Sequence, residues 1–116
     1  MSATLRNATT GSIVAASVLR ANNPWTRGIG LLGRARVAPE EGLWIERCGA
    51  VHTLGMRATI DLYFLDREDR VIRIVPNVPP HRLAIAARGA VSVIELGASS
   101  IERAVAVGDQ LVLERA

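Results

Sequence analysis

The side chains best suited to catalysis or ligand binding lie in one stretch of the chain, residues 51–66, which reads VHTLGMRATIDLYFLD. Its polar cluster consists of His52, Thr53, Met56, Arg57 and Asp61. A histidine and an aspartate can work together, with the carboxylate orienting the ring and the imidazole acting as general base. The sequence therefore allows a hydrolase-type or metal-assisted enzyme that uses His52 and Asp61.

Such an enzyme also needs a nucleophile or an activated water, and no serine, threonine or cysteine of the chain lies in a recognisable catalytic signature. A simpler role for His52 is a hydrogen bond to backbone at the edge of a strand, because intermediate burial is normal for histidine. A simpler role for Asp61 is a salt bridge with Arg57 or Arg73 on a neighbouring strand. Whether the protein is an enzyme stays open, and the balance favours a non-catalytic protein.

A metal site is the next alternative. Cys48, His52 and Met56 offer a thiolate, an imidazole and a thioether at intervals of four residues, which would suit a soft metal ion. Residues four apart in an extended strand are about 13 Å distant, whereas metal–ligand bonds are about 2.0–2.3 Å long. Only a looped segment could gather these side chains. We therefore expect no metal and no cofactor, with Cys48 and Met56 filling the core.

The glycines of residues 28–33 match the dinucleotide-binding pattern G-x-G-x-x-G letter for letter. That pattern needs a strand directly before the first glycine and a full helix after the last, because the helix N-terminus holds the pyrophosphate. Here residues 22–24, Asn-Asn-Pro, precede the glycines, and Pro39 limits any helix that follows. We do not predict a nucleotide site.

The 14 basic residues are all arginines, and the net charge is +3. Arginine pairs well with phosphate, so weak nucleic-acid binding through the arginines is a third alternative. The arginines are scattered among acidic residues, and aromatic side chains make up only 3% of the chain, too few for a base-stacking platform. We therefore do not expect nucleic acid as a partner.

The single cysteine, Cys48, excludes an intramolecular disulfide and fits a reducing compartment. The apolar run at residues 13–19 is shorter than the roughly 20 residues that span a membrane, and its charge pattern is poor for a signal peptide. We expect a soluble, cytoplasmic protein without a membrane partner.

Hydrophobic patterning and turn residues predict six strands. They cover residues 13–19, 43–46, 59–66, 71–75, 90–96 and 110–114. The third of these alternates, with Ile60, Leu62 and Phe64 on one face and Asp61, Tyr63 and Leu65 on the other. It should form a hairpin with the fourth.

Two short helices and one loop complete the predicted elements. One helix is expected at residues 24–32, where Asn23 can cap and Pro24 suits the first position. The other should begin at Ser99, which has capping-box spacing with Glu102. Prolines 76, 79 and 80 predict an irregular loop.

These elements indicate a mainly β, single-domain antiparallel β-sandwich or barrel-like fold with one or two short helices. We assign residues 1–11 to an N-terminal segment that is a candidate for disorder, and residues 12–116 to a single β-rich domain.

Several short motifs occur in a characteristic order. They are G-L-L-G-R at 30–34, E-G-L at 41–43, H-T-x-G-M-R-x-x-I-D at 52–61, F-L-D at 64–66, V-I-E-L-G at 93–97 and G-D at 108–109. Over about residues 12 to 114, this chain resembles the uncharacterised prokaryotic domain-of-unknown-function family 192. The resemblance implies a mainly-β sandwich with a short helix near the start, and it implies no reaction. Many relatives carry an export signal and a W-M-K-N form of the central motif, and this chain has neither.

We expect a non-catalytic β-sandwich module that binds a small ligand or a protein partner. The expected surface surrounds His52, Thr53, Met56, Arg57 and Asp61. On this view, replacing His52 and Asp61 by alanine leaves stability nearly intact.

Overall fold

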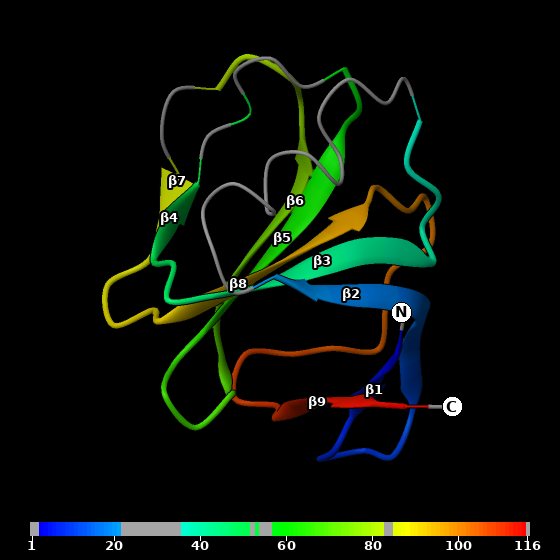
Figure 1. Ribbon diagram of the computed structural model, residues 1–116, viewed down its shortest axis with the longest axis vertical. Coiled ribbons are helices and arrows are strands. Elements are labelled where there is room, and N and C mark those ends of the chain that lie inside the picture. Colours follow the sequence, from blue (N-terminus) through cyan, green and yellow to red (C-terminus); the bar gives the residue numbers. More distant parts are fainter. Residues whose placement is uncertain (1–2, 22–35, 52, 54–56, 83–84, 116) are drawn as a thin grey trace.

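The computed structural model describes residues 3–21, 36–51, 53, 57–82 and 85–115. Within these residues the chain forms nine strands and no helix (Figure 1). The strands are β1 (Ala3–Asn7), β2 (Ile13–Ala21), β3 (Glu41–Glu46), β4 (Ala50–Val51), β5 (Ile60–Leu65), β6 (Val71–Val78), β7 (Ile85–Ala86), β8 (Ser92–Gly97) and β9 (Leu111–Glu114). All six predicted strands are present, and the predicted single-domain β fold is confirmed.

Seven strands form one sheet in the order β6-β5-β8-β3-β2-β1-β9, and β4 pairs with β7 in a small second sheet. The large sheet is mixed, because β2 and β3 run parallel while its other pairs are antiparallel. Parallel neighbours need a crossover of a dozen or more residues. The long connection between β2 and β3, residues 22–40, meets that requirement.

The two edge strands of the large sheet meet at one place. The amide of Val71, at the start of β6, donates to the carbonyl of Asp109 at 2.8 Å, and the amide of Gly108 donates back to the carbonyl of Val71 at 2.7 Å. Next to them, Arg70 and Gln110 form an isolated antiparallel bridge. The sheet therefore curls until β6 reaches the segment before β9, which gives the fold its barrel-like form.

Both faces of the central strands are buried. Inside the curled sheet, Tyr63 and Leu65 of β5 pack with Trp44 of β3, Ile94 of β8 and Leu5 of β1; we call this the inner core. On the opposite face lies the outer core. It contains Ile60, Leu62 and Phe64 of β5, together with Val51 of β4 and Ile85 of β7. The alternation predicted for β5 is thus confirmed, and the small sheet covers the outer face.

The segment that we set apart at residues 1–11 contains β1, which lies between β2 and β9 in the sheet. Leu5 of this strand is fully buried. Residues 3–7 are therefore an ordered part of the domain, because a strand that pairs on both sides and contributes to the core cannot be a free tail.

The helix predicted at Ser99 does not form. The Ser99 hydroxyl accepts a hydrogen bond from the amide of Ile101 and donates to its carbonyl at 2.8 Å. Such local side-chain bonds satisfy backbone groups that a helix would otherwise use. The helix expected at residues 24–32 and the glycine motif at 28–33 lie outside the described residues.

The irregular loop expected from Pro76 onward begins later than predicted, because β6 continues through Pro76 to Val78. A proline cannot donate to a sheet ladder and is tolerated mainly on edge strands. β6 is an edge strand, so Pro76 fits there. In the described part of the chain, no helix is long and apolar enough to cross a membrane.

Candidate functional site

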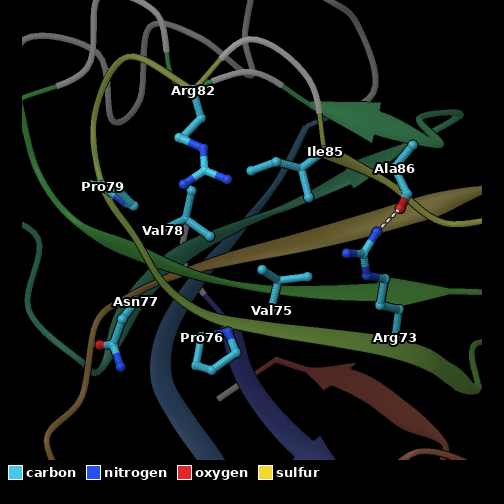
Figure 2. A pocket seen from close by; sticks show the side chains of 9 residues that line it. All are labelled: Arg73, Val75, Pro76, Asn77, Val78, Pro79, Arg82, Ile85 and Ala86. Atoms are coloured by element: carbon cyan, nitrogen blue, oxygen red, sulfur yellow. Dashed lines mark hydrogen bonds between the residues drawn. The ribbon is translucent and has the colours of Figure 1, made fainter.

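A hollow of about 210 Å³ opens between β6, the loop at residues 79–82 and β7 (Figure 2). It faces the same side of the sheet as the outer core, since Val78 and Ile85 belong to that core. Its lining consists of Arg73, Val75, Pro76, Asn77, Val78, Pro79, Arg82, Ile85 and Ala86.

Two arginines line this hollow. Figure 2 shows the Arg82 side chain extending from the loop toward Val78, with Arg73 at the other end beside Ala86 and Val75 between them. None of the lining residues that the structure describes is acidic. The described lining therefore carries positive charge at both ends, with the half-buried Val75 between them.

The two guanidinium groups differ in their partners. Arg73 donates a hydrogen bond to the backbone carbonyl of Ala86, which ties β6 to β7. The Arg82 side chain has no hydrogen bond or ion pair with any residue in the described part of the chain, although its backbone is bonded. Arg82 thus keeps its N–H donors available for a ligand.

Thr53 holds the loop that carries Arg82. The Thr53 hydroxyl donates to the carbonyl of Pro79 at 2.8 Å and accepts from the amide of Arg82 at 2.8 Å. Its amide donates to the carbonyl of Arg82 at 3.0 Å, and its carbonyl accepts from the amide of His81 at 2.9 Å. Thr53 is fully buried. It therefore positions the wall of the hollow and does not line it.

Asp61 holds the floor from the other face of the sheet. Ile60 pairs with Val78 and Leu62 with Val75, so β6 carries one extra residue at this point, a β-bulge. Asn77 in the bulge has a φ of 54°, a left-handed conformation that asparagine tolerates better than most residues. Its amide donates to Asp61 Oδ1 at 2.7 Å. Asp61 thereby accepts a hydrogen bond from the Asn77 amide, which the bulge removes from the backbone pairing of β5 and β6.

The other oxygen of Asp61 forms a buried ion pair with Arg103, and the two side chains are only 6% and 8% exposed. Arg103 Nη2 also donates to the carbonyls of Gly97 and Pro39, at 2.6 and 2.7 Å. The predicted partners Arg57 and Arg73 do not pair with Asp61. Arg73 pairs in register with Phe64 and so lies on the opposite face of the sheet.

A second hollow of about 310 Å³ lies beside this ion pair, between β5, β6 and residues 99–105. Two of its charged lining residues, Asp61 and Arg103, are already paired with each other. Burial raises the pKa of the Tyr63 hydroxyl there, against the opposing effect of a hydrogen bond and the charge of Arg103. We regard this second hollow as structural.

His52 and Met56 lie outside the described residues, and Arg57 is exposed. Cys48 is buried in the outer core, where its thiol donates to the carbonyl of Ala50 at 3.0 Å. Across residues 3–21, 36–51, 53, 57–82 and 85–115, no group of three or more His, Cys, Asp or Glu side chains could hold a metal ion.

Sequence patterns missed Arg73 and Arg82 as lining residues. Both were single arginines outside any motif, and Arg82 follows a Pro-Pro-His segment that reads as an exposed loop. The sequence pointed to this hollow only indirectly. Thr53 and Asp61, which belong to the predicted polar cluster, hold the backbone segments that line it.

Two solved structures share this fold. One is a protein from Sinorhizobium meliloti 1021 named a "putative transcription regulator", with 26% identity and a TM-score of 0.78 over 95% of this chain and 90% of that chain. The other is a protein of unknown function from Novosphingobium aromaticivorans DSM 12444, with 19% identity and a TM-score of 0.74 over 97% of this chain and 84% of that chain. A search of the curated proteins found no match. Residues 5–113 match the family DUF192, described as Uncharacterized ACR, and the chain therefore belongs to that family.

Proposed function

We propose that this protein is a non-catalytic β-domain that binds a small ligand in the hollow between β6, residues 79–82 and β7. The observation that carries the proposal is the Arg82 guanidinium, which extends into the hollow toward Val78 without a protein partner in the described part of the chain. Ligand sites are typically concave and apolar, with a few polar groups that orient the ligand.

The composition of the lining supports binding over catalysis. Among the lining residues that the structure describes, the side chains are arginine, valine, proline, asparagine, isoleucine and alanine, and none of these is a general base or a nucleophile near neutral pH. His81 is exposed and adjoins the hollow in sequence, but it is not among the lining residues. The enzyme that we considered from His52 and Asp61 would need a free carboxylate, and the Asp61 oxygens are occupied by Asn77, Ser99 and Arg103.

The proposal also refines the surface expected from the sequence. Thr53 and Asp61 are buried and hold the backbone around the hollow. The residues proposed to contact the ligand are instead Arg73 and Arg82. Ligand binding of this kind is compatible with the name of the Sinorhizobium neighbour, since regulators commonly respond to small molecules.

The test is an NMR titration of the labelled full chain with a mixed set of small acids, amines, alcohols and amides. Binding in the hollow shifts the amides of residues 73–79 and 85–86, and the bound compound is recovered unchanged. Val75→Phe fills the half-buried floor and should abolish these shifts while the melting temperature stays close to that of the wild type. Shifts that map elsewhere, no binding at all, or conversion of the compound would overturn the proposal.

A further inference from the structure

The two arginines of the hollow between β6, residues 79–82 and β7 have no acidic counter-charge beside them. All 11 acidic residues of the chain lie among the residues that the structure describes, and none of them lines the hollow. From residue 70 to residue 94 the sequence contains four arginines and no acid. Positive charge in a concave site raises the local concentration of anions. An anionic ligand is therefore favoured over a neutral or cationic one.

Arg82 offers the donors that an anion needs. Its guanidinium has no hydrogen bond or ion pair with any residue in the described part of the chain, and Figure 2 shows it extending into the hollow toward Val78. Arg73, at the other end, uses one nitrogen on the carbonyl of Ala86 and keeps its charge. A guanidinium presents several N–H groups in one plane, which match two oxygens of the same carboxylate or phosphate. The group that these donors recognise is therefore an oxyanion.

The exposed surface around these arginines is mainly polar. The branched side chains of Val78 and Ile85 are only 3% and 8% exposed, so they belong to the outer core and offer little area to a ligand. Arg73 and Arg82 are both exposed, and an oxyanion beside them can keep part of its hydration. Recognition therefore depends on the charged group of the ligand and not on its hydrocarbon part.

The backbone that carries Arg82 is held in shape before a ligand binds. Asn77 and His81 have φ values of 54° and 69°, a left-handed conformation that residues other than glycine adopt rarely. Two buried residues hold them, because the Asp61 carboxylate accepts from the amide of Asn77 and the Thr53 carbonyl accepts from the amide of His81. Backbone strain of this kind clusters at binding sites. A loop that is already ordered also loses less entropy when a ligand binds.

We propose that the hollow binds an oxyanion, the carboxylate or phosphate group of a small molecule. This group pairs with the guanidinium of Arg82, and the charge of Arg73 adds to the attraction. The inference rests on the proposed function and names the charged group by which the ligand of that same hollow is recognised.

The experiment is an NMR titration of the isotope-labelled full chain near neutral pH and at low ionic strength. The probes are sodium phosphate, sodium acetate, acetamide and sodium chloride. The signals followed are the side-chain Nε–H of Arg82 and the backbone amides of Arg73 and Asn77. Phosphate or acetate should shift these signals to saturation. Acetamide has the shape of acetate without its charge, and chloride has the charge without paired oxygens, so neither should match the oxyanions.

Arginine variants test whether the oxyanion binds at Arg82. Arg82→Ala should weaken the tighter oxyanion about threefold or more at the amides of Arg73 and Asn77, since a charge-assisted pair open to solvent is lost. Arg82→Lys should lose less, because the charge stays but the planar fork does not. Arg88→Ala is the matched control. Arg88 is also exposed and has no partner in the described part of the chain, but it does not line the hollow, so its loss should have a smaller effect.

The outcomes separate this inference from the function on which it rests. Tighter phosphate identifies a phosphate group and tighter acetate a carboxylate, and both support oxyanion recognition. If acetamide binds as tightly as acetate, the hollow is a ligand site but oxyanion recognition is wrong. Equal shifts with chloride would reduce the effect to ionic screening, and equal losses in Arg82→Ala and Arg88→Ala would reject the role of Arg82. If neither oxyanion binds, the inference fails, while the broader compound set decides separately whether the hollow binds any ligand.

Discussion

The carboxylate of Asp61 and the guanidinium of Arg103 lie 42 residues apart in the chain and meet in a buried ion pair. This pair joins β5 to the segment after β8. Through the other bonds of Arg103, it also reaches Gly97 and Pro39. Asp61, which we expected on the ligand-binding surface from the sequence, therefore joins separate segments of the fold.

Breaking this pair should be costly. Asp61→Ala leaves Arg103 buried without its counter-charge, and such losses amount to about 3–5 kcal/mol of unfolding free energy. This reverses the expectation that alanine at Asp61 is nearly neutral. Chemical denaturation of Asp61→Ala and Arg103→Met measures the effect. The matched control is Glu114→Ala, which removes the exposed Arg6–Glu114 pair and should cost about 0–1 kcal/mol. Equal losses at the two pairs would contradict the assignment.

The hydroxyl of Thr53 should be more important than its shape. Thr53→Val keeps the volume but leaves the carbonyl of Pro79 and the amide of Arg82 without their buried partner. An unsatisfied buried group costs about 1–3 kcal/mol. Thr53→Ser retains the hydroxyl and should lose less. Hydrogen exchange at the Arg82 amide gives a local readout, which should accelerate in the valine variant and not in the serine variant. Unchanged exchange in Thr53→Val would show that the loop is held by other contacts.

Gly97 should tolerate no side chain. A Cβ there would lie 2.2 Å from the carbonyl oxygens of Val37 and Ala38, far inside contact distance, and backbone cannot yield as a side-chain tip can. We expect Gly97→Ala to lower the melting temperature severely. Gly11→Ala is the comparison, because Gly11 has open space but a φ of 83°. It should cost only the left-handed strain of about 1–2 kcal/mol. If Gly97→Ala is the milder variant, the segment 37–38 does not pack on β8 as described.

Asp109 should make stability depend on pH in the acidic range. Its pKa is lowered by hydrogen bonds from the amide of Ala106 and the side chain of Asn7. A lowered pKa in the folded state gives stability that is complete above the unfolded pKa of about 4 and is lost as pH falls through the folded value. The melting temperature of the wild type should therefore exceed that of Asp109→Asn near neutral pH, and the difference should shrink on acidification. A difference that stays constant down to about pH 2 would contradict this role.

Tyr63 is the single tyrosine, so its ionisation can be followed directly by tyrosinate absorbance. Burial raises its pKa above the ordinary value of 10.0, although Arg103 acts in the opposite direction. The folded state therefore keeps Tyr63 neutral longer than the unfolded chain, and stability should fall as pH rises from about 10 through the folded pKa. Tyr63→Phe should remove this alkaline loss. A titration that coincides with that of a blocked tyrosine would show that the ring is solvated.

The strands were predictable because their signals are local. The alternation from Ile60 to Leu65, the charged connection at residues 67–70 and the turn at Gly108 each depend on a few adjacent residues. By contrast, β4 and β7 contain two residues each, too few for a period to be recognised. The non-helical course after Ser99 depends partly on Arg103 reaching across to Asp61, and that contact has no local signature.

Residue types and their spacing were enough to predict the β class, the hairpin of β5 and β6 and the importance of the stretch that contains Thr53 and Asp61, because a period of two residues defines which face of a strand is apolar. The roles of Thr53 and Asp61 depend instead on contacts between distant parts of the chain. The bulge at Asn77 gave Asp61 a backbone amide to bind, and the loop at residues 79–82 folded onto the hydroxyl of Thr53. The same packing brought Arg73 and Arg82 from separate segments to the two ends of one hollow. Contacts between distant segments arise from packing and register, which no short window of sequence contains.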